Sequence, residues 1–83
     1  MSNKVKYINF EHIGLVMFEG TIDHSSMAKN IGFKVLSAGF VNLPFEDSLG
    51  NKPTCFGKSV SLNVESSPKD TEILQRLLNP YGW

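Results

Sequence analysis

The sequence has few of the groups that staple a small protein together. Cys55 is the only cysteine among 83 residues, so no disulfide can form within the chain. A chain without disulfides suits a reducing compartment, and we expect it to be cytoplasmic. A domain of this size buries only about 60–65% of its unfolded-chain surface, and self-association often supplies the missing stability. We therefore expect one domain spanning residues 1–83, with a homo-oligomer as one possible state.

The chain also lacks an excess of charge and a long apolar run. Eight basic residues balance eight acidic ones, and Arg76 is the only arginine. Nucleic acid is an unfavourable partner for such a chain, because phosphate backbones require clustered positive charge. The longest apolar run, Ile13 to Phe18, is far shorter than the roughly 20 residues that span a membrane. No apolar signal core follows Met1, so we expect neither export nor a membrane partner.

Motifs for metal, nucleotide or catalytic chemistry are missing as well. The sequence contains no Cys-x-x-Cys or His-x-x-x-His pair, and its seven glycines form no phosphate-binding loop. We predict no metal, no cofactor and no catalytic residue. One enzymatic alternative stays open, in which Cys55 is a nucleophile with His12 or His24 as its base.

Turn-forming residues divide the sequence into six expected elements. Strands are predicted for residues 5–10, 14–18, 34–43 and 55–65, and a short helix is predicted between the Thr21–Ser26 entry and Gly32. In the last strand Val60, Leu62 and Val64 alternate with polar residues, which is typical of a sheet with one solvated face.

The clearest local signal starts the C-terminal helix. Ser67 suits the N-cap position, Pro68 the first helical position, and Asp70 the positive end of the helix dipole. Asn79-Pro80 ends the helix, whose buried stripe consists of Ile73, Leu74, Leu77 and Leu78.

The element order ββαββα predicts an α+β fold. Its simplest form is a four-stranded antiparallel sheet with the C-terminal helix packed on one face and the short helix between the two hairpins. An alternative position for the short helix is at one end of the sheet. The order of the two hairpins within the sheet stays open.

Short polar residues mark one candidate binding surface. Ser37, Ser59, Ser61 and Asn63 are predicted to form a flat outer face with few long charged side chains, which suits either plain solvation or docking of a partner. Trp83 is a second candidate, since tryptophan is frequent in interface hot spots, unless it folds back onto its own domain. The loop from Phe45 to Pro53 is a third.

Four segments together resemble small uncharacterised phage and prophage accessory proteins of proteobacteria. They are residues 24–28, 35–41, 55–62 and 68–71. That group has no assigned activity, so the resemblance assigns no functional residue. It implies a protein that acts inside a bacterial host cell and binds a host protein, such as a defence factor, to inhibit it. We therefore expect a non-enzymatic protein-binding module, with a small nucleic-acid- or ligand-binding domain and a cysteine-dependent enzyme as alternatives.

Overall fold

The structure, a computed structural model, describes residues 5–42 and 53–78. Within these ranges the chain forms six strands and two helices. They are β1 (Val5–Phe10), β2 (Gly14–Glu19), α1 (His24–Ile31), β3 (Val35–Asn42), β4 (Thr54–Phe56), β5 (Lys58–Ser59), β6 (Val64–Glu65) and α2 (Pro68–Leu78).

The main sheet has four antiparallel strands in the order β2-β1-β3-β4. The predicted α+β class and four-stranded sheet are therefore confirmed. The two hairpins, whose order the sequence left open, join through β1 and β3, so that β1 and β3 are central and β2 and β4 are the edges. A register shift after Asn9 places one additional β3 residue, Leu36, between the partners of Asn9 and Phe10.

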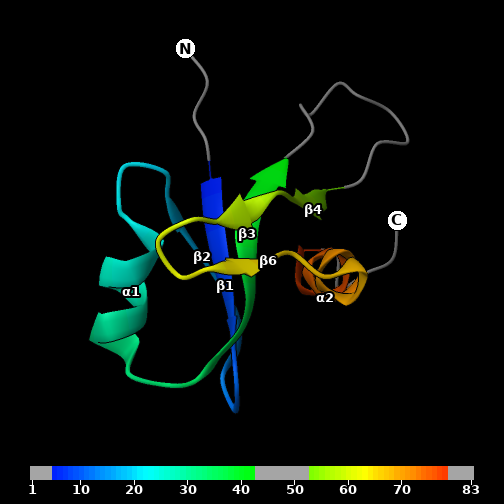
Figure 1. Cartoon of the computed structure of the whole chain (residues 1–83). Coiled ribbons are helices and arrows are strands. Elements are labelled where there is room, and N and C mark those ends of the chain that lie inside the picture. The colour runs from blue at the N-terminus through cyan, green and yellow to red at the C-terminus, as the bar shows by residue number, and fades with distance from the viewer. Residues whose placement is uncertain (1–4, 43–52, 79–83) are drawn as a thin grey trace.

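The two helices cover opposite faces of this sheet, as Figure 1 shows with the sheet between them. Because side chains alternate along a strand, Tyr7 and Val41 point to the face where they pack with Leu74 of α2. Ile8 and Phe10 point to the other face, where the partly buried residues Met27, Ala28 and Ile31 of α1 and Leu62 and Val64 of the β5–β6 segment pack against them. The sequence predicts one packed face and one solvated face, and the structure covers both.

Helix α1 has the predicted ends. Asp23 is the N-cap residue, although its side chain makes no capping hydrogen bond, and Gly32 closes the helix in the left-handed conformation with its N–H donating to the Ala28 carbonyl. The alternative position at the end of the sheet is wrong, because the apolar stripe of α1 packs on the sheet face.

The start of α2 also follows the prediction. The Ser67 N–H donates to Oδ2 of Asp70 at 3.0 Å, and the Lys69 N–H donates to Oγ of Ser67 at 3.3 Å. Each side chain thus satisfies a backbone donor at the helix entrance, as in a capping box.

The strand predicted for residues 55–65 is broken into three short strands. Gly57 has a φ of 76° and ends β4. Residues 60–63 then form a turn, in which the Asn63 N–H donates to the Val60 carbonyl and Asn63 has a φ of 55°. The predicted alternation is present in the sequence, but two left-handed residues fold the segment back on itself as β5 and β6. No helix in the described ranges is long and apolar enough to cross a membrane.

Candidate functional site

The predicted flat polar face does not form. Ser37 is 4% exposed and Ser59 is 2% exposed, so neither presents a surface to a partner. Ser59 uses its Oγ to accept the Leu62 N–H at 3.2 Å, which holds the turn between β5 and β6. Ser61 and Asn63 are exposed in that turn rather than on a sheet face. The expectation is wrong because it assumed one continuous strand where the chain folds over β3.

Ser37 lies on β3 opposite Asn9 of β1, on the face that α2 covers. Its small side chain belongs to the packed interior. Trp83 and most of the loop from Phe45 to Pro53, the other two predicted surfaces, lie outside the described residues.

A buried polar cluster lies under α2. Asp70, 1% exposed, accepts a hydrogen bond from the Tyr7 hydroxyl at 2.5 Å and one from Nδ2 of Asn9 at 3.3 Å, in addition to the Ser67 N–H. Burial, and then the bond to Asp70, raises the pKa of Tyr7 far above its ordinary value. The carboxylate thus has three donors, and its contacts tie the first strand to the last helix.

Cys55 lies beside this cluster as part of β4. Its N–H donates to Oγ1 of Thr71 at 3.0 Å, and the Thr71 hydroxyl lies 3.5 Å from the Cys55 carbonyl, to which it donates. Burial, reinforced by the nearby Asp70 charge, raises the pKa of the Cys55 thiol to about 11. The thiol is therefore protonated at neutral pH, which disfavours Cys55 as a nucleophile.

His24 occupies an apolar position at the start of α1. Its ring makes edge contacts with Phe18 and Phe40, at centroid distances of 5.6 and 5.7 Å. Nε2 lies 2.8 Å from the Gly39 carbonyl, and since a carbonyl only accepts, Nε2 carries the hydrogen. Burial lowers the pKa of His24, so the ring is neutral at neutral pH.

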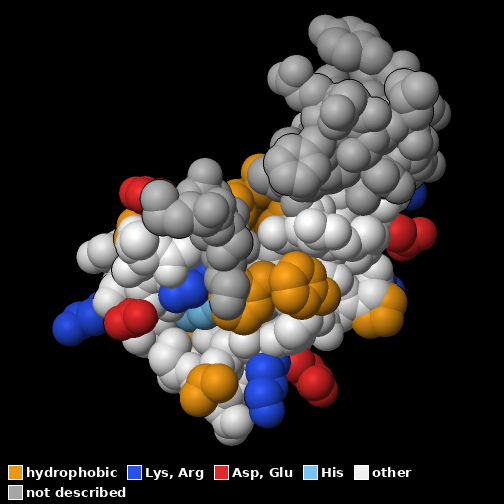
Figure 2. Space-filling view, turned by 90° about the horizontal axis from the view of Figure 1, so that it is seen from above, with side chains coloured by type: hydrophobic (Ala, Val, Ile, Leu, Met, Phe, Trp, Pro, Cys, Tyr) orange, Lys and Arg blue, Asp and Glu red, His pale blue; other side chains and the backbone are white. Residues whose placement is uncertain are grey.

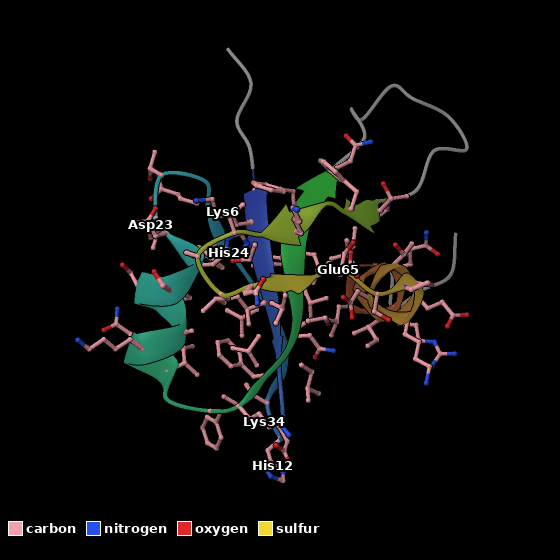
Figure 3. The ribbon with its side chains drawn as sticks, viewed as in Figure 1. Lys6, His12, Asp23, His24, Lys34 and Glu65 are labelled. Atoms are coloured by element: carbon pink, nitrogen blue, oxygen red, sulfur yellow. The ribbon has the colours of Figure 1, made fainter. Side chains whose placement is uncertain are left out.

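A cavity of about 380 Å³ opens beside His24. Figure 3 shows Lys6, Asp23 and His24 close together near the start of α1. The remaining lining residues come from β3 and from the segment that follows Gly57; they are Phe40, Lys58, Val60 and Ser61. Figure 2 looks down on this end of the molecule, where a histidine ring lies next to lysine and hydrophobic side chains. The cavity combines an apolar wall with two ammonium groups.

Of the seven residues that line this cavity, the sequence analysis predicted only Ser61 as a binding residue. One signal for the cavity was available, because Lys6 occupies the same face of β1 as Ile8 and Phe10, where an apolar residue is expected. A lysine in that register needs a polar partner, and Nζ of Lys6 donates to the Ile22 carbonyl at 2.9 Å.

The two edges of the sheet differ in how their backbone groups are used. At the β4 edge, Thr71 bonds both backbone groups of Cys55, and Nε2 of Gln75 donates to the Pro53 carbonyl at 3.1 Å. At the other edge, β2 pairs with β1 alone in the part of the chain that the structure describes.

Comparisons with known proteins identify no relative of this chain. No family model, no curated protein and no solved structure matches the chain.

Proposed function

We propose that this chain is a non-enzymatic protein-binding module that accepts an extended strand of a partner protein along the free edge of β2. Strand addition to an exposed edge supplies main-chain hydrogen bonds for affinity and side-chain contacts for specificity. The observation that carries the proposal is the contrast between the edges: β2 offers six residues without a second neighbour among the described residues, whereas α2 covers the three-residue β4.

The register indicates which β2 groups face outward. Thr71 takes the N–H and carbonyl of Cys55, so these groups point away from β3. In antiparallel pairs, residues alternately point their backbone groups toward and away from each other. Cys55 is opposite Val41, Val41 is opposite Val5, and Val5 is opposite Glu19. Following this alternation, Glu19 and the residues two and four before it, Met17 and Leu15, direct their backbone groups away from β1. The Glu19 carbonyl accepts the Ile22 N–H at 3.1 Å, so the groups offered to a partner are those of Leu15 and Met17 and the Glu19 N–H.

The side chains of β2 do not guard this edge. Natural edge strands are commonly protected by lysine, proline, a bulge or short length. The sequence Gly-Leu-Val-Met-Phe-Glu of β2 has no lysine and no proline, and its only charge is Glu19 at the end. Its register with β1 is regular across all six residues. The edge therefore has the length and composition that strand addition requires.

A narrower version of the proposal concerns the partner. The resemblance to phage and prophage accessory proteins supports a host protein, such as a defence factor of a bacterial cell, that is inhibited when it is bound. A second copy of this chain is another partner for the same edge, through two-fold antiparallel pairing of β2 with β2.

The test uses proline, which removes one backbone donor. Met17→Pro deletes an outward-facing N–H, a substitution that an edge strand tolerates. Tagged wild type, Met17→Pro and the control Val60→Lys are used to capture proteins from bacterial lysate, and self-association is measured by sedimentation velocity. Val60 is 83% exposed and distant in sequence from β2.

We expect a stoichiometric partner, or a dimer, that wild type and Val60→Lys retain and Met17→Pro loses. Binding that persists unchanged in a folded Met17→Pro would contradict the use of this edge. A monomeric wild type that captures nothing from the lysates of several bacterial hosts would contradict the protein-binding proposal itself.

A further inference from the structure

We propose that the cavity lined by Lys6, His24, Phe40 and Lys58 binds a small organic carboxylate with a flat apolar body. The site is separate from the β2 edge and does not depend on the proposed function. Its volume of about 380 Å³ lies at the lower end of the 300–1,000 Å³ range typical of ligand pockets, which suits a ligand of one ring.

The apolar part of the site is an aromatic wall. Phe40 lines the cavity, and Phe56, which is outside the lining, stacks against Phe40 with centroids 5.8 Å apart and ring planes inclined by 30°. Phe40 also meets the His24 ring almost at a right angle, with an interplanar angle of 86°. Val60 extends the wall and is 83% exposed. Aromatic surfaces of this kind attract a second ring through offset stacking or edge contacts.

The charge of the lining favours a single negative charge on the ligand. Lys6 and Lys58 contribute two positive charges and Asp23 one negative charge, which leaves one net positive charge. His24 adds none at neutral pH, because it is buried and neutral. Glu65 is the cross-strand partner of Lys58, but it lines the neighbouring concavity of about 350 Å³ and not this one. A carboxylate matches this balance better than a phosphate monoester, which carries almost two charges.

The fixed position of Lys6 gives the cavity a preorganised cation. Its Nζ is anchored to the Ile22 carbonyl, which uses one of the three ammonium donors and leaves the others available. An anchored lysine loses less conformational freedom on binding than a free surface lysine does. Lys58 also lines the cavity and is exposed, so its ammonium group is available to the same ligand.

The experiment is a titration of the ¹⁵N-labelled full chain with benzoate, followed by amide chemical shifts. Benzamide, of the same shape but neutral, and acetate, which has the charge without the ring, are the two comparison probes. For benzoate we expect a dissociation constant on the order of 1 mM. The shifts should concentrate on residues 6, 23, 24, 40 and 58–61. Benzamide and acetate should each bind at least about fivefold more weakly, since each lacks one of the two contacts.

Two variants locate the charge contact. Lys6→Gln and Lys58→Gln should each weaken benzoate binding about three- to fivefold. Lys34→Gln is the matched control, because Lys34 lies at the opposite end of the molecule in Figure 3 and should leave binding unchanged. Lys58 is exposed, so its variant tests the site even if Lys6→Gln disturbs folding.

Three results would overturn the proposal. They are the absence of benzoate-dependent shifts at these residues, equal binding of benzoate and benzamide, and equal weakening by Lys34→Gln and Lys58→Gln. None of these results bears on partner capture by the β2 edge.

Discussion

The two edge strands of the main sheet, β2 and β4, differ in how far other parts of the described chain bond their outer backbone groups. Every edge strand has backbone groups that lack a neighbouring strand. At β4 the groups of Cys55 are bonded by Thr71, and the strand is only three residues long. At β2 the strand is twice as long and pairs on one side only within the described residues. Among the described residues, side chains of α2 thus bond backbone groups of β4, and no second strand pairs with β2.

The covered edge depends on α2, and α2 depends on Asp70. Asp70→Ala removes an acceptor that serves the Tyr7 hydroxyl, the Asn9 amide and the Ser67 N–H. Leaving the buried Tyr7 hydroxyl and the two partly buried donors unpaired should lower the free energy of unfolding by about 3 kcal/mol, measured by urea denaturation. Exposed Glu72→Ala on the same helix is the control and should change stability by less than about 0.5 kcal/mol. Equal effects would refute the structural role of the cluster.

Proline at adjacent β2 positions tests the direction of the open edge. Val16→Pro deletes an N–H that faces β1 and should destabilise the protein by about 2 kcal/mol or more, since it removes a bond of the ladder. Met17→Pro deletes an N–H that faces solvent and should cost less than about 1 kcal/mol. Thermal denaturation of both variants provides the comparison, and the reverse order of stability would show that the assigned alternation is wrong.

Removing the Thr71 hydroxyl should leave backbone groups of β4 without a partner, as the outward-facing groups of Met17 in β2 are among the described residues. Thr71→Val keeps the shape of the side chain but deletes the hydroxyl that bonds both backbone groups of Cys55. We expect a loss of about 1–2 kcal/mol in the free energy of unfolding, and faster hydrogen exchange at the Cys55 amide. In wild type the Cys55 amide should exchange more slowly than the Met17 amide. Equal rates at these two amides would remove the contrast between the edges.

Acidification should produce the smallest effect, and it acts through the face that α1 covers. Burial is the main cause that lowers the pKa of His24, and the positive charge of Lys6 lowers it further. The bond to the Gly39 carbonyl and the negative charge of Asp23 act in the opposite direction but do not cancel the effect of burial. The unfolded chain therefore binds a proton more readily, near pH 6.5. The stability from neutral His24 is complete above that pH and declines as the pH falls below it.

Urea denaturation at pH 7.5, 6.5 and 5.5 measures this decline. His24→Gln should flatten the profile, because it removes the buried imidazole that loses stability on protonation. A free energy of unfolding that increases from pH 7.5 to pH 5.5 in wild type would contradict the prediction, because protonation of a buried neutral histidine destabilises the folded state.

The sequence predicted the elements better than the surfaces. Helix α2 could be predicted because its capping signals are local, from Ser67 to Asp70, and α1 because Gly32 closes it. The break of the strand at residues 55–65 was missed because alternating Val and Ser residues satisfy a strand pattern whether or not Gly57 turns left-handed. A Cβ at Gly57 would lie 3.1 Å from the Phe40 ring, and this closeness of two distant segments leaves no local pattern in the sequence.

The candidate sites were predicted poorly for a related reason. Ser37 and Ser59 have the same side chain as exposed Ser61, so residue type does not tell them apart. Ser37 is buried on the face that α2 covers, whereas Ser59 and Ser61 differ through the way residues 58–65 fold onto the opposite face. The cavity combines Lys6, His24 and Lys58 from three distant parts of the sequence, and pairing between distant segments leaves no local pattern. The free edge of β2 likewise follows from strand order, which the lengths of the loops did not determine.

The bond between Tyr7 and Asp70 has a consequence for the synthesis of this protein. The two residues are 63 positions apart, so the hydroxyl of a central strand has no acceptor until the intervening residues and Asp70 have been synthesised. Before then, β1 can pair with β2 and β3, but the face that α2 later covers stays exposed. Contacts of such long sequence separation slow folding. The nascent sheet thus passes through a period in which an open face and an open edge coexist, and exposed surfaces of both kinds favour aggregation.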